Sequence, residues 1–202
     1  MRVALFLLLA ACEGDTDPRW QLAHDRIVAI RTTPAAIGPG QTARIDGLVA
    51  SVSAAPAVID PIAVTGPGVA QTGDGWTITA PADGSTVDIL ATFEADGVQL
   101  TGTKSVRLDG ALDNPAVGAV TLDGAPVPAT IAPLVQHDLA IDEPDDVTVR
   151  WLTSCGSLNS DDTEHDAELT VEADDATTGS LVVVVRDDSF GVAWQIWPLS
   201  AR

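Results

Sequence analysis

Along most of this chain apolar residues alternate with polar ones, in short runs that end at Gly, Pro or Asp. This period of two is typical of β-strands that turn one face toward a core. No window of a dozen residues carries the stripe of an amphipathic helix, so we expect an all-β protein. The predicted strands are 26–32, 42–50, 57–64, 75–79, 87–95, 98–108, 117–122, 130–141, 147–153, 167–172, 181–186 and 192–197.

The end of the first half of the chain recurs in the second half. Ser85 and Ser180 each precede or open an apolar strand and lie 95 residues apart, and the turns after those strands contain Gly97 and Gly191, 94 residues apart. The near-constant offset indicates an internal repeat of the size of an immunoglobulin domain. Within the first copy, the pair Asp96-Gly97 supplies the positive φ angles that a two-residue hairpin requires.

We therefore expect two tandem immunoglobulin-like β-sandwiches, at residues 25–108 and 115–202, joined by a linker at 109–114. The spacing of the predicted strands, about eight to twelve residues, fits such sandwiches. Trp151 falls in the third predicted strand of the second half, where immunoglobulin-like cores often contain a Trp. The chain has no Tyr for a tyrosine corner and only two Cys, so both halves look like bacterial immunoglobulin-like or PKD-like domains.

The N-terminus has the form of an export signal. Arg2 is followed by an apolar run much shorter than the ~20 residues that span a bilayer, and then by small residues. Leu9-Ala10-Ala11-Cys12 resembles the lipobox of bacterial lipoproteins. The resemblance implies a cleaved signal peptide at 1–11, lipid on the sulfur and the new amino group of Cys12, and a lipid-anchored tether at 12–24. An ordinary secretory signal with a chance cysteine is the alternative.

A second resemblance concerns the C-terminal region. Segments 151–158, 182–187 and 191–194 are similar to the end of short acidic lipoproteins of high-GC predatory Gram-negative bacteria. This resemblance implies a location in the cell envelope and an immunoglobulin-like fold, and it implies no reaction. Because Glu13 rather than Asp follows Cys12, the lipoprotein resemblance favours delivery to the outer membrane.

The charge of the chain restricts its partners. There are 29 acidic and 10 basic residues, a formal net charge of −19, and Lys104 is the only lysine. A nucleic-acid partner is excluded, because phosphate neutralisation needs clustered Lys and Arg. The Asp residues fall largely in the turns between strands, so the charge is expected on loops and rims around ordinary apolar cores.

No group of residues in the sequence indicates catalysis. His24, His137 and His165 are dispersed and do not have the spacing of zinc ligands. The chain contains no Gly-X-Ser-X-Gly, no phosphate-binding Gly loop and no His-Glu-X-X-His. With Cys12 acylated, Cys155 has no partner for an internal disulfide. It lies on the apolar face of its strand, so a buried, inert thiol is expected. We expect no catalytic residue and no enzyme.

Two weaker features suggest binding. Carboxylates and an amide gather in the linker and in one loop of the second half, and domain junctions often bind calcium through such oxygens. The candidate calcium ligands are Asp109, Asp113, Asn114, Asp142, Asp145 and Asp146. Trp194 and Trp197 must lie on opposite faces of one strand. Trp194 is expected in the core, and Trp197 is a candidate exposed platform for a sugar or a protein, with packing as its alternative role.

The leading hypothesis is a lipid-anchored cell-envelope protein that acts as a non-enzymatic binding or structural module. One alternative is a carbohydrate-binding accessory or envelope hydrolase that uses Trp197 and nearby carboxylates. The other is a calcium-stabilised adhesion or spacer protein, and calcium is the only cofactor considered. The expected partners are the membrane, through the N-terminal lipid, and another envelope protein or a polysaccharide.

Overall fold

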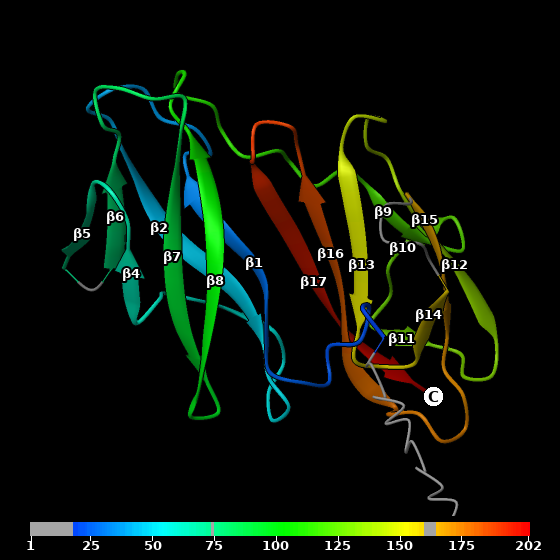
Figure 1. The fold of residues 1–202 in the computed structure, drawn as a ribbon. Coiled ribbons are helices and arrows are strands. Elements are labelled where there is room, and N and C mark those ends of the chain that lie inside the picture. Colours follow the sequence, from blue (N-terminus) through cyan, green and yellow to red (C-terminus); the bar gives the residue numbers. More distant parts are fainter. Residues whose placement is uncertain (1–17, 74, 160–164) are drawn as a thin grey trace, which may run out of the picture.

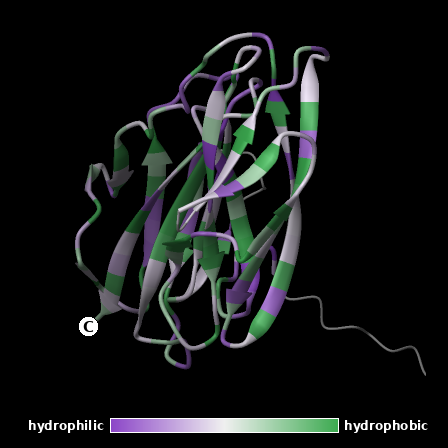
Figure 2. Ribbon diagram, turned by 90° about the vertical axis from the view of Figure 1, so that its left-hand side faces the viewer, coloured by the Kyte–Doolittle hydropathy of each residue, from purple (hydrophilic) through white to green (hydrophobic). Residues whose placement is uncertain are grey.

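In the computed structural model of the protein, residues 18–73, 75–159 and 165–202 are described. Every regular element within those ranges is a β-strand, and the strands form two sandwiches that lie side by side (Figure 1). Apolar and polar residues alternate along several of these strands (Figure 2), as expected for sheets with one face in a core. The all-β prediction is confirmed.

The first sandwich pairs a sheet of order β1-β2-β6-β5, with β3 beside the end of β2, against a sheet of order β4-β7-β8. Neighbouring strands in both sheets are antiparallel. The strands are β1 (Arg26–Thr33), β2 (Thr42–Ala50), β3 (Ala57–Ile59), β4 (Ala63–Thr65), β5 (Val69–Thr72), β6 (Gly75–Thr79), β7 (Thr86–Ala95) and β8 (Val98–Arg107).

The second sandwich pairs a sheet of order β10-β9-β12-β15-β14 against a sheet of order β11-β17-β16-β13, in which β11 runs parallel to β17. The strands are β9 (Val120–Leu122), β10 (Ala125–Pro126), β11 (Thr130–Ile131), β12 (Gln136–Ile141), β13 (Thr148–Thr153), β14 (Ser157–Asn159), β15 (Asp166–Thr170), β16 (Thr178–Arg186) and β17 (Val192–Ala201).

Both sandwiches have the strand order of an immunoglobulin domain, with A, B, E and D in one sheet and C, F and G in the other. In the first these are β1, β2, β6 and β5, then β4, β7 and β8; in the second, β9, β12, β15 and β14, then β13, β16 and β17. The repeated segment therefore occupies equivalent places, since β7-β8 and β16-β17 are both F-G hairpins. The fold is two tandem immunoglobulin-like β-sandwiches.

Each sandwich encloses its own apolar core. In the first, the ring of Phe93 lies against Gly47, where a Cβ atom would come within 2.5 Å of it, so only glycine fits there. In the second, Trp151 on β13 is 2% exposed among core residues, which matches its expected place on strand C. The hairpin at Asp96-Gly97 is also confirmed, with φ of 50° and 78°.

Two predicted strands are in fact divided. The predicted strand 57–64 becomes β3, which pairs with β2, and β4, which pairs with β7 in the opposite sheet. Pro61 lies between them and has no N–H for a sheet ladder. The predicted strand 130–141 becomes β11 and β12, because Pro133 and the left-handed Leu134 (φ 61°) interrupt it. The short strands β5, β10 and β14 were not predicted.

Candidate functional site

A third apolar cluster lies between the two sandwiches. Its buried members come from the N-terminal segment, from the first sandwich and from the second, and Trp194 and Ile196 pack against it. They are Leu22, then Val28, Ala29, Leu48 and Ala50, then Leu152, Val182, Val184 and Val192. The two domains are therefore joined by a continuous apolar interface rather than by a linker alone.

Two strands have the sequence that this interface requires. A register shift in the pairing of β1 with β2 lies between Ile27 and Ala29, and Val28 and Ala29 both belong to the interface. Strand β16 carries five consecutive apolar residues, Leu181 to Val185, all of them buried. Its odd-numbered positions fill the second core, while Val182 and Val184 face the first domain. Such a continuous apolar run is typical of a strand covered on both faces.

The segment expected to be a tether is folded from residue 18 onward. Gln21 forms a parallel bridge with Thr153 at the end of β13, and the backbone of Thr153 exchanges hydrogen bonds of 2.9 Å with Leu22 and with Trp20. The Leu22 side chain is 1% exposed within the interface. Residues 20–22 therefore belong to the second sandwich, although the next strand, β1, belongs to the first.

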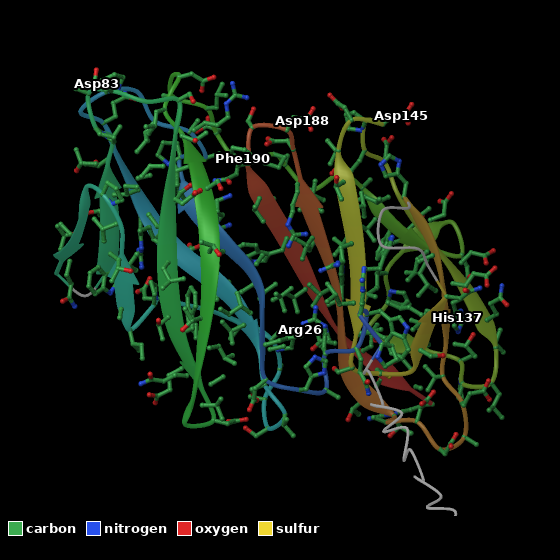
Figure 3. The ribbon with its side chains drawn as sticks, viewed as in Figure 1. Arg26, Asp83, His137, Asp145, Asp188 and Phe190 are labelled. Atoms are coloured by element: carbon green, nitrogen blue, oxygen red, sulfur yellow. The ribbon has the colours of Figure 1, made fainter. Side chains whose placement is uncertain are left out.

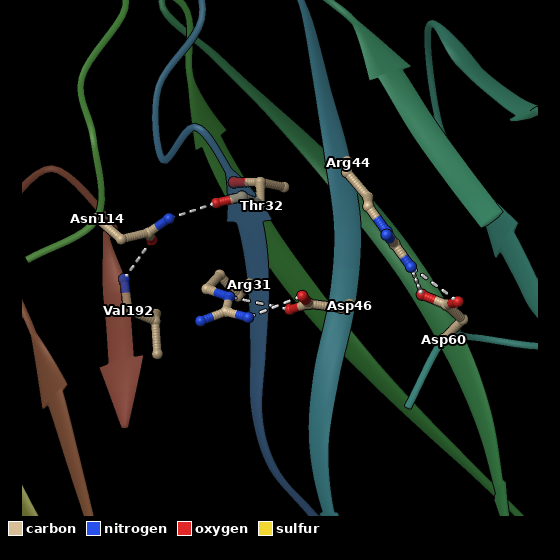
Figure 4. Close-up of polar contacts among 7 residues, drawn as sticks. All are labelled: Arg31, Thr32, Arg44, Asp46, Asp60, Asn114 and Val192. Carbon is tan, nitrogen blue, oxygen red and sulfur yellow. Dashed lines mark hydrogen bonds and ion pairs between the residues drawn. The ribbon is translucent and has the colours of Figure 1, made fainter. Parts of the chain in front are cut away.

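Polar contacts fix how the domains are oriented (Figure 4). The Asn114 amide donates to the carbonyl of Thr32 at 2.8 Å, and its oxygen accepts from the N–H of Val192 at 2.8 Å. One linker side chain thus binds β1 and β17 together. The guanidinium of Arg31, which forms two hydrogen bonds with Asp46 of 3.0 and 2.8 Å, also lies 4.1 Å from the ring centroid of Trp194.

A cleft of about 540 Å³ opens at one end of this interface, between β1 and β8 of the first domain and the turn from β16 to β17. Its lining combines apolar side chains, such as Ile27, Leu100 and Val192, with polar ones. The charged residues of the lining are Lys104, Arg186 and Asp187. Its volume lies within the range of small-molecule sites.

Lys104 is the most unusual residue of the cleft. It is 8% exposed, and its Nζ donates a hydrogen bond to the backbone carbonyl of Phe190 in the other domain. Burial, and secondarily the positive charge of Arg186, lower the pKa of Lys104 to about 8, against a smaller opposing effect of Asp187. Lys104 forms no ion pair within the described residues.

Arg186 is the second cation of the cleft. Its Nη2 donates to the carbonyl of Val28 at 3.1 Å, across the domain interface. Burial and the neighbouring Arg150 lower the pKa of Arg186. Both cations of the cleft thus bind backbone carbonyls of the opposite domain, and carbonyls carry no net charge to offset theirs.

The turn that closes the cleft is held by Asp187. One oxygen of its carboxylate accepts hydrogen bonds from the N–H groups of Ser189 at 2.9 Å and Gly191 at 2.7 Å. Phe190, between them, has a φ of 64° and is 41% exposed at the rim. Figure 3 shows Phe190 at this turn, on the side of the first domain. A non-glycine residue with positive φ is uncommon, and such residues often occur at functional sites.

The described structure does not gather the candidate calcium ligands into one cluster. Asp109 pairs with Arg107, and the amide of Asn114 is engaged in the domain interface. Across residues 18–73, 75–159 and 165–202, no group of three or more His, Cys, Asp or Glu side chains is placed to hold a metal ion. The loop with Asp142, Asp145 and Asp146 therefore does not complete a carboxylate cluster with Asp113 and the rest of the linker.

The two tryptophans of β17 lie in different environments. Trp194 and Trp197 lie on opposite faces of β17, as expected, but Trp194 faces the domain interface and Trp197 packs, partly buried, against the second core. One face of β17 packs on the second core and the other on the domain interface. Because both faces carry apolar residues, the sequence alone did not show which face belongs to the core. The expected role of Trp194 in the core is therefore corrected.

The remaining candidates have structural positions. Cys155 is buried in the second core, where burial raises the pKa of its thiol, so it is the inert cysteine that was expected. His137 lies between the carboxylate of Asp123, at 2.7 Å, and the carbonyl of Ala132, at 2.9 Å. Cys12, the predicted lipidation site, lies outside the described residues.

No family model matches the chain, and no curated protein matches it. Among solved structures, a chimeric titin Z1Z2 tandem is 14% identical, over 88% of this chain and 99% of its own, with a TM-score of 0.30. Fibronectin(III)-like modules of Clostridium thermocellum CbhA are 13% identical over 86% and 94%, with a TM-score of 0.32.

An endo-fucoidan hydrolase of glycoside hydrolase family 107 is 17% identical over 84% of this chain, with a TM-score of 0.28, and this chain spans only 28% of the hydrolase. The strand order, independent of these comparisons, defines the class: a tandem pair of immunoglobulin-like domains. The described residues include no helix with the length and hydrophobicity that crossing a bilayer requires.

Proposed function

We propose that this protein is a lipid-anchored component of the cell envelope, in the outer membrane of a Gram-negative bacterium. In it, two immunoglobulin-like domains act as one rigid, non-enzymatic binding or structural module. The observation that carries the module is the apolar interface between the domains. Domains that move independently expose polar surfaces to one another, whereas here nine buried apolar residues are shared between them.

The hydrogen bonds across the interface support the same role. Three side chains bind backbone carbonyls across this interface. Lys104 and Arg186 each donate to a carbonyl of the opposite domain, and Asn114 of the linker donates to a carbonyl of β1. Breaking the interface would leave these buried donors without partners in addition to exposing apolar area. A module of this kind holds its binding surfaces at a constant distance and angle.

The anchor rests on the sequence resemblance of Leu9-Ala10-Ala11-Cys12 to a lipobox. Folding of the segment that begins at Pro18 shortens the connection to the membrane. The six residues from Cys12 to residue 17 reach at most ~22 Å when extended. The module is therefore held close to the bilayer, with another envelope protein or a polysaccharide as its partner.

The anchor is tested by replacing each cysteine in turn. Cys12→Ser should abolish incorporation of labelled palmitate and shift the protein from the membrane to the soluble fraction, because no thiol remains to be acylated. Cys155→Ala is the matched control: it removes the buried thiol and should leave labelling and fractionation unchanged. Continued labelling of Cys12→Ser, or membrane association equal to that of the control, would contradict the proposal.

A further inference from the structure

The cleft between the domains gathers positive charge in a protein that is strongly acidic. Its lining includes the only lysine of a chain with a formal net charge of −19, together with Arg186. Burying a cation is costly unless an opposite charge offsets it. The charged groups that face this pair are Asp187, on the turn after β16, and Arg150, on β13, which adds a third positive charge near Arg186.

The nearest carboxylate, Asp187, also lines the cleft and offsets the charge of Lys104 only in part, so two cations face one anion. One oxygen of Asp187 is occupied by the N–H groups of Ser189 and Gly191, which it needs to shape the turn. Neither Lys104 nor Arg186 forms an ion pair within the described residues. Arg186 has five N–H donors, and within the part of the chain that the structure describes one of them is engaged, with Val28. The guanidinium therefore retains donor capacity at the cleft.

The rest of the cleft accommodates an organic body rather than a bare ion. Apolar side chains form part of its walls, and Phe190, which is 41% exposed, lies at the rim. A volume of about 540 Å³ is sufficient for a single sugar ring. Aromatic rings at the rim of such sites contribute area at little cost in conformational entropy.

We propose that this cleft binds a sugar-sized organic anion, with its carboxylate or phosphate group between Lys104 and Arg186 and its ring against Phe190. The ligand adds a second negative charge to that of Asp187, so that the two cations are balanced. Because both domains provide its walls, the site exists only while they remain docked. The inference deepens the binding role proposed above and rests on it, but it is independent of the lipid anchor.

The test is calorimetric titration of the full chain with three probes that share one ring: glucuronate, glucose 6-phosphate and neutral glucose. We expect saturable binding of one or both charged sugars and none of glucose. The charged probe that binds more tightly identifies the source of the anion, a uronic acid or a phosphorylated sugar. Equal binding of glucose, or binding of no probe, would overturn the proposal.

The variants test the assigned residues. Lys104→Gln should weaken binding by about tenfold or more, the usual effect of losing one charge-assisted hydrogen bond, and Lys104→Arg should restore most of it. Arg44→Gln is the matched control, because it removes one positive charge from an exposed pair with Asp60, and neither residue lines the cleft. An equal loss in Arg44→Gln would mean that net charge alone is responsible and would overturn the assignment.

Phe190→Ala provides a variant that does not depend on a buried side chain. It should weaken binding severalfold and lower the unfolding temperature much less than a core substitution does, since Phe190 is 41% exposed. Binding to the wild type should also weaken between pH 7 and pH 9, as Lys104 loses its proton. Binding that is unaffected by Phe190→Ala and by pH would place the ligand elsewhere and refute the site.

Discussion

Because the N-terminal segment is folded from residue 18, a substitution in it should destabilise the protein, whereas a substitution in a free tether should not. Leu22→Ala removes three methylene-sized groups from a side chain that is 1% exposed and lies between the domains. At ~0.8 kcal/mol for each buried group, the loss of transfer free energy is about 2.4 kcal/mol. A residual cavity adds to this, as in other Leu→Ala substitutions in cores, so we expect a destabilisation of about 3 kcal/mol.

The assay is urea and thermal unfolding of the purified protein, followed by Trp fluorescence. A loss of about 3 kcal/mol lowers the ratio of folded to unfolded molecules by roughly a hundredfold. For a chain of this length it lowers the melting temperature by about 6–12 °C. Leu134→Ala is the control, because Leu134 is 64% exposed and should lose no more than ~0.5 kcal/mol. Equal effects of the two substitutions would refute the packing of residues 20–22.

Two further predictions concern other contacts. Trp194→Ala should lower the free energy of unfolding by about 2 kcal/mol, because a partly buried ring and its contact with Arg31 are lost, whereas Trp194→Phe should retain most of it in the same urea assay. Burial lowers the pKa of His137, but hydrogen bonds with Asp123 and a carbonyl outweigh this and raise it overall. The stability that this raised pKa contributes is present below pH ~6.5 and is lost as pH rises through the folded-state pKa. Asp123→Asn should therefore reduce the fall in the free energy of unfolding measured between pH 5.5 and pH 8. An unchanged fall would contradict this role of Asp123.

Local patterns were sufficient to predict most of the fold. Alternation located the strands, Asp96-Gly97 located a hairpin, and the 94- to 95-residue offset identified two equivalent F-G hairpins. These predictions succeed because each depends on neighbouring residues and on one buried face. The divided strands were missed because Pro61 and Leu134 interrupt a ladder without ending the apolar pattern.

The domain interface could not be predicted in the same way. When both faces of a strand are buried, as in β16 and β17, alternation shows that two faces differ but not which one faces the core. Trp194 was therefore assigned to the core, although it faces the domain interface. Lys104 has no local sequence feature that distinguishes it, because its burial depends on a turn 86 residues away. The cleft is a property of how the two domains dock.

The bridge between Gln21 and Thr153 has a mechanical consequence. A pull on the N-terminus reaches β13 of the second domain through the hydrogen bonds of Trp20 and Leu22 before it reaches β1. Although the first domain is next in sequence, the pull reaches its strand β1 only after those hydrogen bonds have broken and the Leu22 side chain has left the interface. For tension between the N-terminus and β17, both of which are attached to the second domain, that domain bears the force and the first domain lies outside its path.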